Sequence, residues 1–157
     1  MISIEIPGQT ELLLKYAVFD MNGTLTTDGI IAEETKKKLQ ILADKLKIII
    51  LTADTFGKAK TVFKDSSTEL HILDNSIPGA EAKLNFIEKL GVEHCVAVGN
   101  GSNDFLMLKH SALGIAVTGE EGLSVKAVCN ADIVVKRIDD AIDLLLNTKR
   151  IKATLRL

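Results

Sequence analysis

The sequence predicts a doubly wound α/β fold, in which a mainly parallel sheet carries helices on both faces. The first observation is that short apolar runs alternate with helical patterns along almost the whole chain. The second is that several runs are apolar throughout, as expected of strands covered on both faces. With 157 residues, 46% of them hydrophobic, the chain is expected to form one domain, residues 1–157, with its own core.

The N-terminal segment is expected to form a β-hairpin that leads into the sheet. Residues 2–6 alternate apolar and polar side chains, and the Pro7-Gly8 pair after them marks a turn. The following sequence TELLLKYAVF returns the chain and enters a buried strand that ends at Asp20. Residues 33–46 then place leucines at helical spacing and predict the first helix.

The rest of the chain continues the alternation of strands and helices. The predicted strands are 47–53, 69–74, 95–100, 113–119 and 131–136, and the predicted helices are 56–64, 80–90, 102–111, one from about 121, and 139–147. Ser102 is the predicted N-cap of the helix that it opens. In open parallel sheets, ligands bind beyond the carboxyl ends of the strands. The polar residues that follow the strands should therefore converge on one site.

Charge and composition exclude several classes of protein. The net charge of −2 implies no broad basic face for nucleic acid. No stretch approaches the apolar length of a membrane span, and the N-terminus lacks a signal-peptide pattern. Cys95 and Cys129 match no zinc motif and are expected to be buried thiols in a reducing cytoplasm. The basic C-terminal sequence TKRIKATLRL is expected to be a solvated tail or an edge strand.

Chemically informative residues stand at the ends of the predicted strands. Asp20 ends the first buried strand and Thr52 the second, Asp104 follows the strand 95–100, and Lys83 lies near the start of a helix. This set suits phosphoryl transfer through a covalent carboxylate. Asp20 would be the nucleophile, and Asp104 would help to hold Mg²⁺ against it. Thr52 and Lys83 would hold the phosphoryl oxygens.

Further residues near these strand ends are candidates for binding the substrate. Gly23 would let backbone N–H groups approach an anion, and so would Gly101. Asn103 could contact the phosphate or simply cap a helix, and the same two interpretations apply to Asp54.

Four motifs resemble those of the haloacid dehalogenase superfamily, in the same order. They are DMNGTLT (20–26), LTAD (51–54), Lys83 and GNGSND (99–104). The closer likeness is to the phosphorylation domain of P-type ATPases, whose aspartate motif reads Asp-Lys-Thr-Gly-Thr-Leu-Thr. The resemblance covers about residues 16–147. It implies a Rossmann-like fold, a phosphoenzyme and Mg²⁺ as cofactor.

The resemblance also assigns roles to individual residues. It implies that Asp20, Asn22, Thr52 and Lys83 are the catalytic positions. Gly23, Thr24, Ala53 and Asn103 would bind the substrate, and Asp20, Asn22, Asn100 and Asp104 would bind the metal.

The sequence differs from that of P-type ATPases because it lacks a nucleotide-binding domain and membrane helices. Only residues 25–51 separate the first two motifs, too few for a nucleotide-binding domain, and no membrane helices are present. The second gap, residues 55–82, is also short, so the chain resembles a capless member whose lid would be the flap near TTDGI (26–30). Such a member obtains closure from an oligomeric partner or a large substrate, or does without. A detached ATPase domain that works with a membrane partner is a further alternative.

Two asparagines stand where catalytic aspartates are common in this superfamily. At position 22, phosphatases carry a second aspartate as acid–base, and Asn22 cannot exchange a proton at neutral pH. Turnover is therefore expected to be slower by about 10²–10⁴-fold. Asn100 stands where an aspartate near Mg²⁺ is usual, so we expect weaker metal affinity.

Three interpretations of these asparagines stay open. The chain could be a slow cytoplasmic, Mg²⁺-dependent hydrolase acting on a phosphorylated small molecule or a phosphoprotein, with no nucleic-acid partner, and could form a homo-oligomer. It could be a non-catalytic module that binds phosphate or a protein partner. The asparagines could also be artificial substitutions of catalytic residues.

Overall fold

The central feature of the structure is a six-stranded parallel sheet. The computed structural model describes residues 1–53, 59–63 and 67–157, so Asp54 lies outside the described residues. The sheet has the order β5-β4-β3-β6-β7-β8. The strands are β3 (Tyr16–Asp20), β4 (Lys47–Thr52), β5 (Thr68–Ile72), β6 (Cys95–Gly99), β7 (Leu113–Val117) and β8 (Ile133–Val135). The predicted doubly wound parallel sheet is confirmed.

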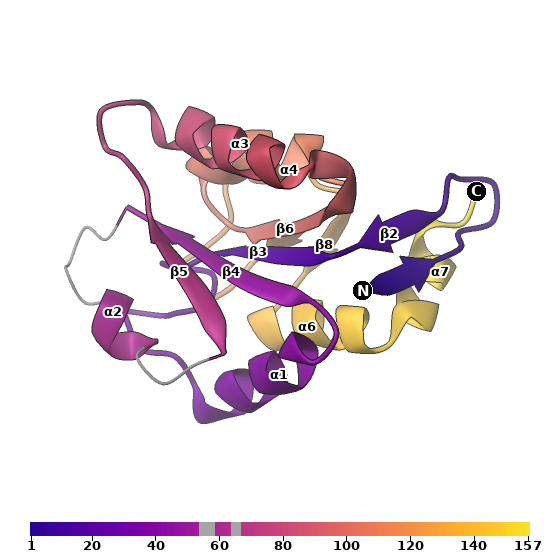
Figure 1. The fold of residues 1–157 in the computed structure, drawn as a ribbon, viewed down its shortest axis with the longest axis horizontal. Helices are drawn as coiled ribbons and strands as arrows, with labels where there is room; N and C mark the ends of the chain where they lie inside the picture. The colour runs from indigo at the N-terminus through magenta and orange to yellow at the C-terminus, as the bar shows by residue number, and fades with distance from the viewer. Residues whose placement is uncertain (54–58, 64–66) are drawn as a thin grey trace.

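Helices cover both faces of this sheet (Figure 1). On one face lie α1 (Glu33–Ala43), α2 (Ala59–Val62) and α6 (Ile138–Leu146), and on the other α3 (Gly79–Leu90), α4 (Phe105–His110) and α5 (Val125–Val128). Successive strand residues point to opposite faces. Ala17 and Phe19 of β3 accordingly join the core under α1 and α6, whereas Val18 joins the core under α3 and α4.

The predicted N-terminal hairpin is also present. Strand β1 (Ile2–Ile4) pairs antiparallel with β2 (Leu12–Leu14), and β2 leads directly into β3. The hairpin therefore lies beyond the amino end of β3, on the side opposite to Asp20. Among the described helices, none combines the length and the apolarity that a membrane span requires.

The C-terminal prediction was wrong, because the basic sequence forms the helix α7 (Thr148–Leu155). Lys, Arg, Ala and Leu are good helix formers, and Ile151 is fully buried in the core next to the half-buried Leu155. This apolar pair at i, i+4 spacing anchors the helix on the molecule, so the segment is neither a tail nor a strand.

Three local expectations also differ from the structure. Ser102 opens a short 3₁₀ turn (Ser102–Asp104) rather than α4, and its hydroxyl bonds to the Ser124 hydroxyl at 2.6 Å. The helix expected from about 121 begins at Val125, because Ser124 provides the N-cap by accepting a hydrogen bond from the Lys126 N–H. Cys129 is exposed, whereas Cys95 is buried as expected.

Candidate active site

The register of the sheet gathers the predicted residues at one edge. Asp20 of β3 pairs with Leu51 of β4, and Phe19 pairs with Val98 of β6. The three strands consequently end at the same level. Asp20 and Thr52 are the last residues of β3 and β4, and Asn100 directly follows β6, at the edge of the sheet where the sequence predicted a site.

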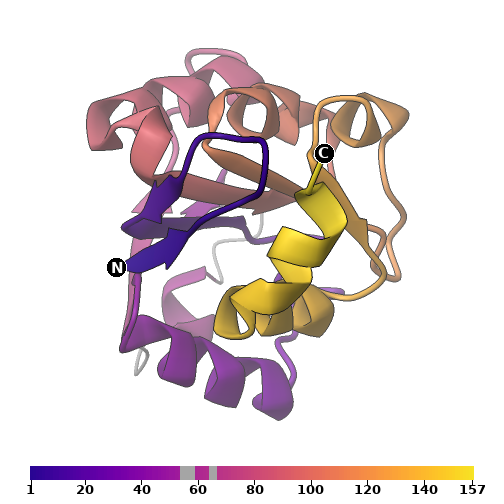
Figure 2. The same ribbon diagram turned by 90° about the vertical axis from the view of Figure 1, so that its right-hand side faces the viewer.

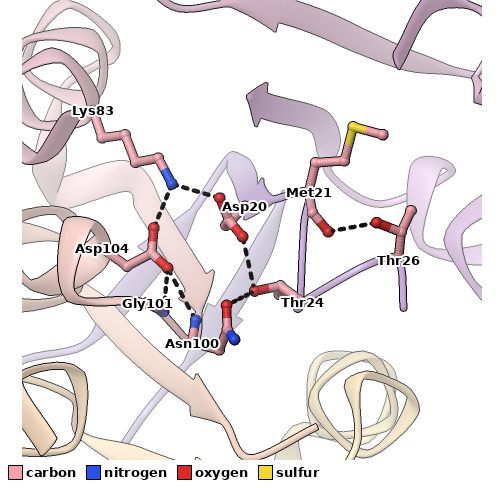
Figure 3. Close-up of polar contacts among 8 residues, drawn as sticks. All are labelled: Asp20, Met21, Thr24, Thr26, Lys83, Asn100, Gly101 and Asp104. Atoms are coloured by element: carbon pink, nitrogen blue, oxygen red, sulfur yellow. Dashed lines mark hydrogen bonds and ion pairs between the residues drawn. The ribbon is translucent and has the colours of Figure 1, made fainter. Parts of the chain in front are cut away.

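Lys83 connects the two carboxylates of this site. It lies near the start of α3, and its Nζ is 2.5 Å from Asp20 Oδ1 and 2.5 Å from Asp104 Oδ1 (Figure 3). The lysine side chain is 1% exposed, so the ammonium is held away from water. A buried ammonium is costly unless it is paired and hydrogen-bonded. The two carboxylates meet this requirement, and Lys83 in turn offsets the cost of burying them.

Asp104 is held by hydrogen bonds to both of its oxygens. Its Oδ1 faces Lys83, and its Oδ2 accepts hydrogen bonds from the backbone N–H groups of Asn100 at 3.0 Å and Gly101 at 2.8 Å. A Cβ at position 99 would lie 2.5 Å from this carboxylate, so glycine is required at Gly99. The carboxylate of Asp104 therefore positions the lysine and the loop that carries Asn100.

Thr24 bridges the second oxygen of Asp20 to Asn100. Its hydroxyl lies 3.1 Å from Asp20 Oδ2 and 3.0 Å from Asn100 Oδ1 (Figure 3). The Asn100 amide is oriented by its Nδ2, which donates to the Gly122 carbonyl at 3.0 Å. A hydroxyl has one hydrogen and can donate to only one of these oxygens at a time. The two oxygens on either side of Thr24 thus form an electron-rich pair that favours a cation.

The charges of the site are not balanced by the protein alone. Burial and, next, the negative charge of Asp104 raise the pKa of Asp20 to about 7, although Lys83 and Thr24 partly lower it. Burial lowers the pKa of Lys83, but Asp20 and Asp104 together outweigh this effect, so that the pKa is raised overall. Two carboxylates share one ammonium, which leaves one negative charge for a proton or a metal ion to neutralise.

The donor atoms of the site fit a hard divalent cation such as Mg²⁺. Mg²⁺ is usually bound by one or two carboxylates together with waters and substrate phosphates. Asp20 Oδ2 and Asn100 Oδ1 are donors of this kind, whereas the oxygens of Asp104 face Lys83 and two N–H groups. Within residues 1–53, 59–63 and 67–157, no group of three His, Cys, Asp or Glu could hold a metal. Waters and a bound phosphate would have to complete the shell.

The remaining predicted residues lie around this centre. Asn22 is half-buried and its backbone bridges to Thr26 in the turn after β3, while Gly23 has φ of 77°, which favours glycine. Thr52 is buried, and Ala53 is exposed just beyond β4.

Asn103 is exposed and lies against the start of α3. Its Cβ is 3.6 Å from the place that a Cβ at Gly79 would take. The hydrogen bonds of the centre thus connect Asp20, Thr24, Lys83, Asn100 and Asp104, and Asn103 lies at its edge.

Glu121 is a residue at this site that the sequence analysis missed. Its Oε1 accepts a hydrogen bond from the Asp28 N–H at 2.9 Å, where Asp28 has the left-handed φ of 52° at the tip of the flap. A Cβ at Gly23 would lie 3.0 Å from Glu121 Oε2 and 2.6 Å from Asn100 Nδ2. Glu121 belongs to no motif, and position 121 was expected to begin a helix. Because Glu121 follows the carboxyl end of β7, the rule that ligands bind beyond the strand ends could have indicated it as a site residue.

Comparison with known proteins gives both sequence relatives and structural neighbours. No family model matches the chain. The uncharacterized protein MJ0073 of Methanocaldococcus jannaschii is 52% identical over 79 residues, which cover 48% of this chain and 85% of MJ0073. The chain belongs to the same family as MJ0073.

Solved structures decide the fold. The cobalt-bound deoxy-D-mannose-octulosonate 8-phosphate phosphatase of Haemophilus influenzae superposes with a TM-score of 0.71 at 14% identity, covering 92% of this chain and 94% of the phosphatase. The chain has the haloacid dehalogenase fold. The Moraxella catarrhalis 3-deoxy-D-manno-octulosonate 8-phosphate phosphatase, solved with magnesium and phosphate ions, has a TM-score of 0.62 at 19% identity, covering 91% of this chain and 94% of its own.

The likeness to P-type ATPases is also found in space. A zinc-transporting PIB-type ATPase has a TM-score of 0.61 at 23% identity, covering 79% of this chain but 20% of the ATPase. In the described part of this haloacid dehalogenase fold, only α1 stands between β3 and β4, and only α2 between β4 and β5. The described residues therefore match the expected capless arrangement.

Proposed function

We propose that this protein is a phosphohydrolase that works through an aspartyl phosphate on Asp20. The observation that carries the proposal is the buried Lys83 ammonium, which lies 2.5 Å from Asp20 Oδ1 and 2.5 Å from Asp104 Oδ1 at the carboxyl edge of the sheet. Burying a lysine between two carboxylates costs desolvation free energy. Phosphoryl transfer gives this arrangement a purpose, because it uses a carboxylate as nucleophile and an ammonium to offset the charge of the phosphoryl group. The structural likeness to phosphatases of the haloacid dehalogenase fold supports the same conclusion.

In the proposed reaction, the Asp20 carboxylate attacks phosphorus, the ester P–O bond breaks, and the leaving oxygen takes its proton from water. Lys83 holds Asp20 in place and offsets the negative charge on the phosphoryl oxygens, with the Thr52 hydroxyl as a second donor. Thr24 keeps Asp20 Oδ2 and Asn100 Oδ1 close together. Mg²⁺, held by Asp20, Asn100 and the Asn22 carbonyl, would supply further charge neutralisation; the contribution of Asp104 would be indirect, through Lys83 and the loop. Water then hydrolyses the aspartyl phosphate.

We expect turnover to be slow because position 22 lacks an acid–base. An amide neither protonates the leaving alcohol nor activates water, and a positioned acid–base is worth about 10²–10⁴-fold. Good leaving groups, such as the acetate of acetyl phosphate, need no protonation and should react best.

The substrate class in this proposal is a phosphorylated small molecule or a phosphoprotein. A site without a cap is open to large substrates, and a second copy of the chain could close it. The exposed Cys129, which remains a free thiol, is compatible with the reducing cytoplasm that we propose as the location.

The decisive experiment is phosphate release from a panel of phosphoesters and acetyl phosphate, with and without Mg²⁺. We expect metal-dependent release from the native chain and none from Asp20→Ala. Asp44→Asn removes one exposed carboxylate at the end of α1 and should behave as the native chain does. Equal release by native protein and Asp20→Ala would show that the proposed nucleophile is wrong.

A second candidate is a module that binds phosphate or a partner without turnover. The two asparagines, Asn22 and Asn100, favour it because each removes a charge that catalysis commonly uses. Asn22→Asp separates the candidates. A gain of about 10²-fold or more in phosphate release would show working machinery that lacks an acid–base. No gain, together with phosphate binding, would favour the binding module.

A further inference from the structure

A pocket lies between the N-terminal hairpin and α7, at the end of the molecule away from Asp20. Figure 2 shows α7 alongside the loop of the hairpin. The pocket has a volume of about 490 Å³, within the range of small-molecule sites. The Gln9 side chain donates to the Leu155 carbonyl, and the Leu157 N–H donates to the Pro7 carbonyl. These bonds join the two walls of the pocket.

Three cationic side chains line this pocket, two from α7 and one from Arg156, the C-cap residue that follows it. Lys149, Lys152 and Arg156 follow one another at i, i+3 and i+7, which places them on one face of the helix. In the parts of the chain that the structure describes, none of the three forms an ion pair with an acidic side chain. Glu5 is the single acid among the pocket residues, so the pocket carries an excess of positive charge.

Lys149 stands in the first turn of α7, where a helix disfavours a cation, whereas Lys152 in the last turn and Arg156 at the C-cap stand where cations are favoured. The first turn of a helix favours acids because its N–H groups carry partial positive charge. Helices α1 and α6 follow this rule, with two acids each in the first turn, whereas α7 has none and carries Lys149 there. Neighbouring cations on one face also repel each other. A bound anion would relieve both penalties.

We propose that this pocket binds a small organic phosphate carrying at least two negative charges. The three cations match the phosphate oxygens by charge-assisted hydrogen bonds. Pro7 and Ala153 supply an apolar surface for the rest of the ligand, and Glu5 accepts a hydrogen bond from a hydroxyl or amine on it. No step of chemistry is part of this site, and the proposal does not depend on the activity at Asp20.

The test is a titration of the full chain with inorganic pyrophosphate in the presence of EDTA. Calorimetry measures the affinity and stoichiometry, and NMR of the backbone amides locates the bound anion. We expect one bound pyrophosphate and shifts in residues 5–8 and 149–156. The double substitution Lys149→Ala and Lys152→Ala should weaken binding by at least about tenfold. Lys37→Ala, an exposed lysine of α1, is the matched control and should leave the affinity unchanged.

Three results would overturn the proposal. Shifts confined to residues 99–104 would place the anion at the active site instead. Equal affinity of the double variant and the native chain would show that α7 does not hold it. The third result comes from two other anionic probes: vesicles of equal parts phosphatidylcholine and phosphatidylglycerol, and a 20-nucleotide single-stranded DNA. Binding of either probe without binding of pyrophosphate would mean that Lys149, Lys152 and Arg156 bind a membrane surface or a nucleic acid instead of a small phosphate.

Discussion

The charged side chains at the two ends of the sheet differ in burial and in pairing. At the carboxyl end, Asp20, Lys83 and Asp104 are buried and joined by short ion pairs. At the amino end, Lys149, Lys152 and Arg156 line a pocket, form no ion pair with an acidic side chain in the described residues, and keep contact with water. Buried charges must be paired because desolvation is expensive, whereas exposed charges lose little by remaining unpaired. Removal of one charge should therefore have large effects at one end and small effects at the other.

The largest effect is expected from Lys83→Met. This change leaves two buried carboxylates without their cation, and breaking a buried pair in this way costs about 3–5 kcal/mol. Denaturant unfolding without metal measures the loss. Lys89→Met, at an exposed position of the same helix, is the control and should stay within about 0.5 kcal/mol of the native chain. Similar stabilities of the two variants would show that removal of the buried Lys83 charge costs no more than removal of an exposed charge.

The next effect is a dependence of stability on pH that comes from Asp20. Its pKa is about 7 in the folded chain against an ordinary value of 3.8. Between these values the unfolded chain has lost the proton that the folded chain still binds, so stability should fall as pH rises from about 4 to about 7. Urea unfolding in EDTA at several pH values measures the slope. Asp20→Asn should flatten it, and an equally steep slope in that variant would assign the titration elsewhere.

Saturating Mg²⁺ should remove this dependence of stability on pH, because a metal-bound Asp20 carries no proton, as in the unfolded chain. The proposed Mg²⁺ site uses the carboxylate form of Asp20, so metal binding below pH 7 should displace a proton and the affinity should rise with pH. Calorimetric titration in two buffers of different ionisation enthalpy measures the released proton. Metal binding without proton release at about pH 6 would contradict a ligand role for Asp20.

A smaller effect is expected where the flap meets Glu121. Glu121→Ala removes the acceptor of the Asp28 N–H, and a net hydrogen bond is worth about 0.5–1.5 kcal/mol. The Asp28 amide should then exchange with deuterium about 2–10-fold faster. Glu121→Gln retains an acceptor oxygen and should keep the protection, and Glu120→Ala controls for loss of a neighbouring acid. Unchanged exchange in Glu121→Ala would show that this carboxylate does not hold the flap.

The smallest effect on stability is expected at the amino end of the sheet, and it is a gain rather than a loss. Lys149→Glu places an acid in the first turn of α7 and should stabilise the chain by about 0.3–1 kcal/mol. Thermal unfolding at low salt measures the gain, which should shrink in high salt because exposed charges are screened. Destabilisation by this change would mean that Lys149 has a partner in the folded chain.

The local pattern of the sequence was sufficient for the sheet, the helices on its faces and the edge where the site lies. Apolar strands separated by helices allow few arrangements, so Asp20, Thr52 and Asn100 were expected at the same edge of the sheet, where the strand register places them. The order of the motifs also indicated the haloacid dehalogenase fold. These inferences depend on periodicity and on residues close to one another in the chain.

Only the tertiary structure decided what each polar atom contacts. The oxygens of Asp104 face Lys83 and two backbone N–H groups, and Asn100 faces Thr24, whereas a metal-ligand role for Asp104 stays a prediction. Glu121 reaches the flap from a loop 93 residues away in the chain. The C-terminal helix depended on Ile151 finding a place in the core. Such contacts follow from strand order, loop paths and burial across the whole molecule, and periodicity within a short window carries none of that information.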